Sequence, residues 1–197
     1  MSEHGIHLQL TLGNSTLRLY SGRIQALEVK LKHQLVTDAC TTRPIFVPPD
    51  GNRSSKPTGD IRIKLSGADT GGAVAILEVH TDPDFSTPIH VHHVEDECFY
   101  AIEGEYEVKV GDEIFHLKPG GSVYAPRLIP HAISDVSGGG GNMIVVAQPA
   151  GQIEAFSIDL FKLISSGIRD GATLKALFLK HDMEVVGPPL PRKSINQ

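Results

Sequence analysis

The chain has 197 residues, 40% of them hydrophobic and 21% charged, with a net charge of −5 at pH 7. This composition is ordinary for a globular protein and excludes the strongly basic surface that nucleic-acid binding requires. No apolar run approaches the roughly 18 residues of a transmembrane helix. We therefore expect neither nucleic acid nor a membrane among the partners of this protein.

The N-terminal sequence MSEHGIHLQL lacks the basic start and apolar stretch of a signal peptide. Two cysteines, Cys40 and Cys98, are too few for a disulfide framework, and we expect both to be reduced thiols. These features together predict a cytoplasmic protein.

The first 60 residues contain three segments with different patterns. Apolar residues alternate on both sides of Gly13-Asn14 between residues 6 and 19, which is typical of a β-hairpin. Residues 24–36 fit a helix or a strand equally well. Residues 41–60 are rich in proline and predict an extended arm.

Strand signals dominate the middle of the chain. The apolar run 73–80 and the segment 143–148 each predict a strand, the second following a glycine loop at 138–141. Residues 105–118 predict a hairpin with a two-residue turn at Gly111-Asp112. That turn places four apolar side chains on one face: Tyr106, Val108, Phe115 and Leu117.

The C-terminal region has the spacing of helices. Apolar residues from Ile153 to Ile164 recur at helical intervals, and Gly167 is suited to ending this helix. A second helix is predicted up to His181, with Asp170 as its N-cap. The tail from Gly187 is predicted to be irregular.

Titratable residues are concentrated in the segment PIHVHHVEDECFYAIEG, residues 88–104. His90 and His92 point to the same side of a strand, because side chains two apart share a face. A hairpin would bring Glu97 beside them, and His131 is a fourth candidate. Three imidazoles and one carboxylate suit a divalent transition metal: Fe, Mn, Ni, Co, Cu or Zn. Polar side chains of this kind can also face water, and the residues alone leave both interpretations open.

The spacing of these residues resembles the two sequence motifs of the cupin superfamily. The first motif is H-x-H, four residues, Glu, six residues and Gly, which corresponds here to His90, His92, Glu97 and Gly104. The second motif is Gly, five residues and P-x-G-x-x-H, three residues before an Asn, which corresponds to Gly120, Pro126 and His131. Three positions depart from the motifs, since the usual residues are replaced by Asp84, Leu128 and Asp135. None of the three is a ligand position.

The resemblance implies an all-β fold: a double-stranded β-helix, or jelly-roll, barrel of the cupin type with short C-terminal helices. The corresponding organisation is residues 1–56 as N-terminal strands and arm, 57–165 as the barrel, and 166–197 as C-terminal helix and tail. It also implies a homodimer, in which the N-terminal strands either exchange between chains or cover their own sheet.

The resemblance further implies a metal held by His90, His92, Glu97 and His131. Among cupins the chain is most similar to the quercetinase-like branch, in which the glutamate both binds the metal and takes a proton. Glu97 is therefore the predicted catalytic residue, with a basicity raised by a dry pocket. The predicted pocket residues are Phe99, Ala101, Tyr106 and Tyr124, of which both tyrosines could equally be core residues.

We expect a dioxygenase acting on a small flavonol-like, enol or aromatic substrate. A metal- and ligand-binding protein without turnover is an alternative, and so is a metal-dependent isomerase or epimerase. Convergent positive charge in the pocket would favour a sugar phosphate, so the lining of the pocket discriminates among these functions.

Overall fold

The computed structural model describes residues 8–12, 15–19, 43–168 and 170–190, and the chain divides into two units, Met1–Arg43 and Pro44–Gln197. In the first unit, β1 (Leu8–Leu12) and β2 (Ser15–Leu19) pair antiparallel, as the alternating pattern predicts. The predicted turn at Gly13-Asn14, the ambiguous segment 24–36 and Cys40 lie outside the described residues.

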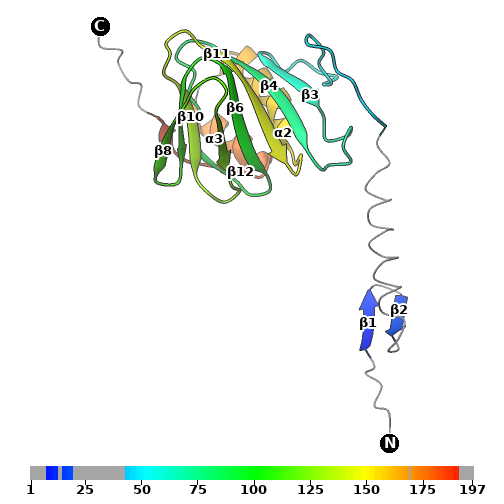
Figure 1. Ribbon diagram of the computed structural model, residues 1–197. Helices are drawn as coiled ribbons and strands as arrows, with labels where there is room; N and C mark the ends of the chain where they lie inside the picture. Colours follow the sequence, from blue (N-terminus) through cyan, green and yellow to red (C-terminus); the bar gives the residue numbers. More distant parts are fainter. Residues whose placement is uncertain (1–7, 13–14, 20–42, 169, 191–197) are drawn as a thin grey trace, which may run out of the picture. The chain divides into compact units, whose positions relative to one another are not determined.

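The described part of the second unit consists of ten strands and two helices (Figure 1). The strands are β3 (Ile61–Leu65), β4 (Ala75–Thr81), β5 (Pro88–His92), β6 (Asp96–Glu103), β7 (Tyr106–Val110), β8 (Glu113–Leu117), β9 (Ser122–Ala125), β10 (His131–Asp135), β11 (Gly141–Gln148) and β12 (Met183–Pro189). The helices are α2 (Ile153–Ser165) and α3 (Gly171–Lys180). Neither is long and apolar enough to cross a membrane.

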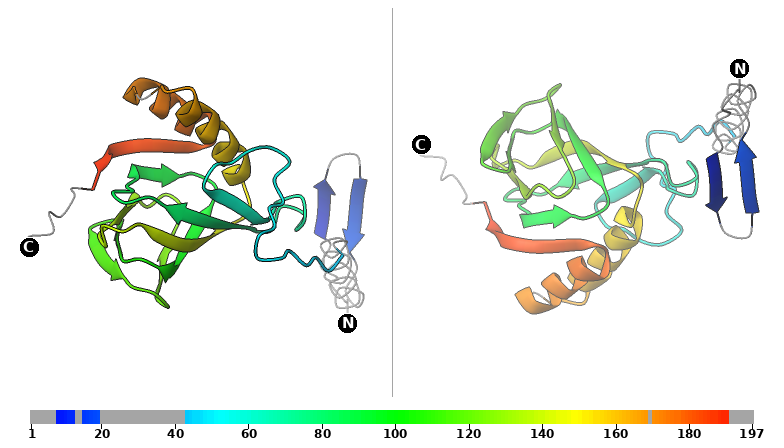
Figure 2. Two further views of the ribbon diagram at one scale, coloured as in Figure 1. Left: turned by 90° about the horizontal axis from the view of Figure 1, so that it is seen from above. Right: turned by 90° about the horizontal axis from the view of Figure 1, so that it is seen from below.

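The ten strands form two five-stranded antiparallel sheets, in the orders β3-β4-β11-β6-β9 and β12-β5-β10-β7-β8. This is the predicted jelly-roll arrangement, and the all-β fold class is confirmed. Figure 2 shows α2 and α3 together on one side of the barrel, beside β12. The two helices therefore cover one flank of the barrel.

The core lies between the two sheets because side chains alternate between inside and outside. Burial alternates residue by residue along β4 and through most of β11, as period-two strands with one buried face require. Both sheets and both helices contribute buried apolar residues, including Ile63, Leu77, Phe99, Val108, Ile133, Met143, Phe156 and Phe178.

The structure contains the predicted β7–β8 hairpin and the predicted N-cap of α3. The hairpin of β7 and β8 pairs Val110 with Glu113 across the turn, which is the predicted register. The Asp170 side chain accepts a hydrogen bond from the backbone N–H of Thr173 (2.8 Å) and so caps α3. The strand β12 is an element that the sequence analysis missed, since it runs through the tail predicted to be irregular. The three-part domain division stays a prediction, although β12 pairs with β5 inside the barrel.

Two of the departures from the cupin motifs have a backbone explanation. Asp84 (φ 70°) and Leu128 (φ 67°) both adopt the left-handed conformation. Glycine enters this region without steric cost, whereas a side chain disfavours it. Both replacements therefore stand at backbone positions that favour glycine.

The third departure, Asp135, organises the glycine loop after β10. Its carboxylate accepts four hydrogen bonds, from the backbone N–H and hydroxyl of Ser137 and from the backbone N–H groups of Gly138 and Gly140 (2.6–3.4 Å). Gly140 (φ 72°) has no room for a side chain, because a Cβ would overlap the carbonyl oxygen of Thr81. Burial acts to raise the pKa of Asp135, but the hydrogen bonds from Ser137 and Gly140 outweigh it and lower the pKa.

We expect Asp135→Asn to lower the free energy of unfolding by about 1–3 kcal/mol at neutral pH, although the cupin motif carries Asn here. The amide has one acceptor oxygen, and its NH₂ group would face backbone donors. Because the folded-state pKa is depressed, the wild-type advantage is complete above the unfolded value of about 3.9 and is lost as the pH falls through the folded value. Urea unfolding of both proteins across this range measures the difference. A constant difference at all pH values would contradict the role of the charge.

Candidate metal centre

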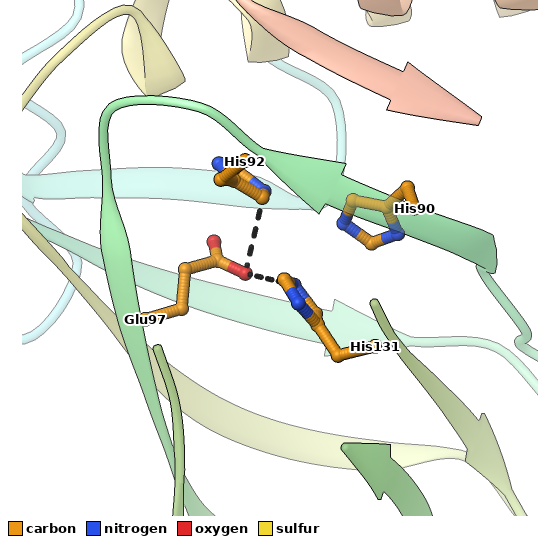
Figure 3. A group of neighbouring side chains, drawn as sticks. All are labelled: His90, His92, Glu97 and His131. Carbon is orange, nitrogen blue, oxygen red and sulfur yellow. Dashed lines mark hydrogen bonds and ion pairs between the residues drawn. The ribbon is translucent and has the colours of Figure 1, made fainter. Parts of the chain in front are cut away.

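Neighbouring strands and the facing sheet bring four titratable side chains together. His131 of β10 lies directly opposite His90 of β5 in the sheet register, and His92 follows two residues along β5 on the same face. Glu97 comes from β6 in the other sheet. Figure 3 shows the three imidazoles and the carboxylate converging on a common point. We call these four residues the His/Glu cluster.

The cluster is enclosed by protein. The exposed fractions are 7% for His90, 1% for His92, 5% for Glu97 and 1% for His131. One possible ligand atom from each residue lies within 4.8 Å of all the others. Two atoms bound to one metal ion at about 2.0–2.2 Å are separated by at most about 4.4 Å, so the cluster is within a few tenths of an ångström of the spacing that a shared ion requires.

Each imidazole is held by its Nδ1 atom. Nδ1 of His90 lies 2.8 Å from the carbonyl oxygen of Pro88, and Nδ1 of His131 lies 3.0 Å from that of Ile129. Nδ1 of His92 faces a carboxylate instead, that of Glu95, at 3.3 Å. Since all three Nδ1 atoms face acceptors, this arrangement favours the neutral tautomer with the proton on Nδ1. The Nε2 lone pairs are then free to bind a metal.

The number of N–H donors on the imidazole rings favours a cation between the histidines and Glu97. Nε2 of His131 lies 3.1 Å from Oε2 of Glu97, and Nε2 of His92 lies 3.5 Å from the same oxygen. A neutral imidazole has one N–H, which Nδ1 already uses. The hydrogen bond between His131 and Glu97 therefore requires a second proton on that ring or a metal ion among these atoms, and three nitrogens with one oxygen suit such an ion. The cluster could hold one of the predicted divalent metals.

Burial and charge act in opposite directions on the pKa values of the cluster. Burial, and next the positive charges of His131 and His92, lower the pKa of His90 to about 3. Burial also lowers the pKa of His92, but the charges of Glu97 and Glu95 raise it above its ordinary value.

For Glu97, the structure reverses the direction expected from the sequence. Burial acts to raise the pKa of this carboxyl, as predicted for a dry pocket, but the charge of His92 and the hydrogen bond from His131 outweigh it. The resulting pKa is about 2. Glu97 is therefore ionised throughout the neutral range, and the expectation of raised basicity is wrong for the chain without a metal.

The other predicted pocket residues differ in their positions. Phe99 is 4% exposed and lines the cavity beside the cluster. Ala101 and Tyr106 are fully buried in the core, where the hydroxyl of Tyr106 lies 3.0 Å from Oγ1 of Thr81. Tyr124 is 57% exposed, and its prediction as a pocket residue is wrong. It pairs with Cys98, which the strand alternation turns away from Glu97, so both lie on the outer face of their sheet.

Histidines outside the cluster have other surroundings. The His93 side chain is 46% exposed, 3.8 Å from Glu184, as expected for the face opposite His92. His116 pairs with Glu105 on the surface at 2.8 Å. His181 is buried, and its Nε2 lies 3.2 Å from Asp159. None of these belongs to the cluster.

Two features of the site were not predicted. Glu95 is 1% exposed and contacts His92, although the sequence analysis gave it no role. Its position three residues after His92 is the only sequence signal. Asp96 forms a two-pronged ion pair with Arg127 at 2.8–2.9 Å, which joins the start of β6 to the loop before His131.

Residues 77–146 match the Cupin_2 family, described as a cupin domain. This match spans both motifs, so the resemblance of this part of the chain to the cupin family is confirmed. No curated protein compared with the chain gives a significant match.

Several solved structures are similar to parts of the chain. The protein TT1209 from Thermus thermophilus is 32% identical, with 40% of this chain and 74% of that chain covered and a TM-score of 0.38. KdgF from Halomonas sp. is 21% identical (55% and 94% covered, TM-score 0.44). An RmlC-like cupin from Shewanella frigidimarina is 20% identical (55% and 93% covered, TM-score 0.45). The TM-scores are too low to support any functional argument.

We expect His92→Ala to lower the affinity for a divalent metal by more than about 100-fold. Replacing a residue that only hydrogen-bonds to a metal ligand already lowers the affinity by up to about that factor. The matched control is His93→Ala, which removes an exposed imidazole from the adjacent position and should leave metal content unchanged. Metal analysis of both proteins, purified without chelator and then loaded with one equivalent of Co²⁺, measures the effect. Equal losses from the two variants would contradict the assignment of the ligand face.

Proposed function

We propose that this protein is a metal-dependent dioxygenase acting on an uncharged enol or aromatic small molecule, such as a flavonol. The observation that carries the proposal is the cavity beside the His/Glu cluster. Its volume is about 820 Å³, within the usual range for sites that enclose small molecules. His90, His92 and Glu97 are among the residues that line it.

The cavity wall is mostly apolar and comes from both the barrel and the helices. The apolar lining includes Leu77, Val79, Phe99, Met143, Phe156 and Phe178. The ring of Phe178 in α3 lies edge-on to His90, with centroids 5.3 Å apart, and packs against Phe156 of α2 at 4.9 Å. The two helices therefore cover the cluster with aromatic side chains. Such a wall favours an aromatic substrate and limits the access of water.

The charges around the cavity are unfavourable for anionic substrates. Four aspartates lie among the described residues that line the cavity: Asp60, Asp82, Asp84 and Asp170. The described lining contains neither Lys nor Arg. A phosphorylated sugar brings about two negative charges, and proteins normally bind these with Arg or Lys. The lining therefore supports an uncharged substrate over a sugar phosphate, and the oxygenase over the isomerase alternative.

Glu97 is the group best placed to accept a proton from the substrate. It is ionised, it lines the cavity, and His92 and His131 hold its Oε2 atom on the cluster side. A metal ion bound by the cluster would coordinate the substrate's oxygen atoms and lower the pKa of its hydroxyl. Even a carboxylate of low basicity can then take this proton, while the apolar wall holds the ring in place.

We expect Glu97→Gln to keep part of the bound metal and to lose nearly all oxygen consumption with a flavonol or related enol. Removal of a general base costs about 10²–10⁴ in rate. An oxygen electrode measures turnover, and metal analysis of the same samples shows whether occupancy accounts for the loss. Glu78→Gln is the matched control, because Glu78 is a hydrogen-bonded carboxylate on β4 that lies outside the cavity.

Oxygen consumption by the wild-type protein distinguishes turnover from binding alone. It would be loaded in turn with Fe, Mn, Ni, Co and Cu and mixed with flavonols. If it binds these compounds but consumes no oxygen with any of the metals, the oxygenase proposal fails. The function as a non-catalytic metal- and small-molecule-binding protein would then replace it.

A second prediction concerns substrate charge. An uncharged flavonol should bind at least about tenfold more tightly than its phosphate ester, because the acidic lining repels the added charge. Fluorescence titration at two ionic strengths measures both affinities, and the difference should shrink at high salt. Tighter binding of the ester would contradict the proposed substrate class.

A further inference from the structure

We propose that Glu95 is a positioning residue that sets the proton and the orientation of His92, and that it connects this ligand to the start of α2. This inference rests on the metal site of the proposed function. Glu95 is not a ligand itself, because it lies on the Nδ1 side of the His92 ring, whereas Nε2 points toward Glu97.

His92 differs from the other two histidines in what holds it. His90 and His131 each face the carbonyl oxygen of the residue two positions earlier in the chain. His92 ends β5, and the chain turns directly after it. The acceptor for its Nδ1 is therefore a side chain, the carboxylate of Glu95. Of the three imidazoles, only that of His92 depends on a replaceable side chain for its orientation.

The two oxygens of the Glu95 carboxylate each have a hydrogen-bonding partner. Its Oε2 lies 3.3 Å from Nδ1 of His92, and its Oε1 accepts the backbone N–H of Gln152 at 2.7 Å. Gln152 is the N-cap residue of α2, where a negative charge is favourable. Gly151 leaves the space for this contact, because a Cβ there would overlap Oε1 of Glu95. Both oxygens of the carboxylate are thus committed as acceptors.

An amide of the same shape cannot accept hydrogen bonds from both His92 and Gln152. Glutamine has one acceptor oxygen, and the shorter contact, with the N–H of Gln152, would retain it. The NH₂ group would then face Nδ1 of His92 and donate to it. That donation places the ring proton on Nε2, the atom that must be free of a proton to bind a metal.

We expect Glu95→Gln to lower the affinity for Co²⁺ alone by about 10–100-fold, the usual effect of losing an outer partner of a ligand. The visible spectrum of the bound Co²⁺ should change as well, since the His92 ring is no longer fixed. Competition with a chromophoric chelator measures the affinity, and circular dichroism establishes that each variant is folded.

Two controls separate positioning from general stability. Gln152→Ala keeps the backbone N–H that Glu95 accepts but removes side-chain contacts with His181 and Asp182 (3.3 and 2.9 Å). It should lower the thermal midpoint without changing Co²⁺ affinity. Glu78→Gln repeats the substitution away from the cluster and should change neither the affinity nor the spectrum.

A measurement on the metal-free wild-type protein requires no variant. Long-range ¹⁵N NMR of its histidines at alkaline pH should show His92 with its proton on Nδ1. A proton on Nε2 would overturn the proposal, and so would a Glu95→Gln protein with wild-type Co²⁺ affinity and spectrum. If the wild type binds no Co²⁺, the proposed metal function fails, while the NMR result still decides the role of Glu95.

Discussion

The rest of the structure depends on one constraint: four titratable side chains converge in the apolar interior of a barrel. Groups of this kind are costly to remove from water unless each polar atom finds a partner. Here Nδ1 of every imidazole has an oxygen acceptor, and Glu97 faces the Nε2 atoms of His92 and His131. The strands, the turn after β5 and the helices all contribute to this arrangement. A bound cation would complete it, since it supplies the positive charge at the point where the four side chains meet.

The sheet topology explains why these particular residues can meet. The pairing of β5 with β10 sets His90 against His131, and the facing sheet supplies Glu97. Without β12, β5 would be an edge strand with open backbone groups. β12 pairs along it, opposite His90 and His92, and α3 packs Phe178 against the His90 ring. The C-terminal elements thus shield β5 from solvent and also form one wall of the cavity.

Local patterns were sufficient to predict the four residues of the His/Glu cluster, the β7–β8 register and the Asp170 cap, because each follows from residue spacing along one or two elements. They were insufficient where the answer depends on distant pairing. The segment of β12 contains Gly187-Pro188-Pro189, which is typical of a turn, but proline is tolerated on an edge strand such as this one. Glu95 and Asp96 look alike in sequence, yet the fold buries the first against His92 and turns the second toward Arg127. The outward position of Tyr124 follows from its pairing with Cys98, which the four-residue strand β9 does not reveal by itself.

The order of these elements along the chain has a consequence for synthesis. All four members of the His/Glu cluster leave the ribosome before α2, α3 and β12 do, so a nascent chain carries these side chains before it has the elements that cover them. At that stage Glu95 still lacks the backbone N–H of Gln152, and β12, one of the two partner strands of β5, does not yet exist. If the cluster binds a metal, its covered site is therefore complete only once the C-terminal elements have been made.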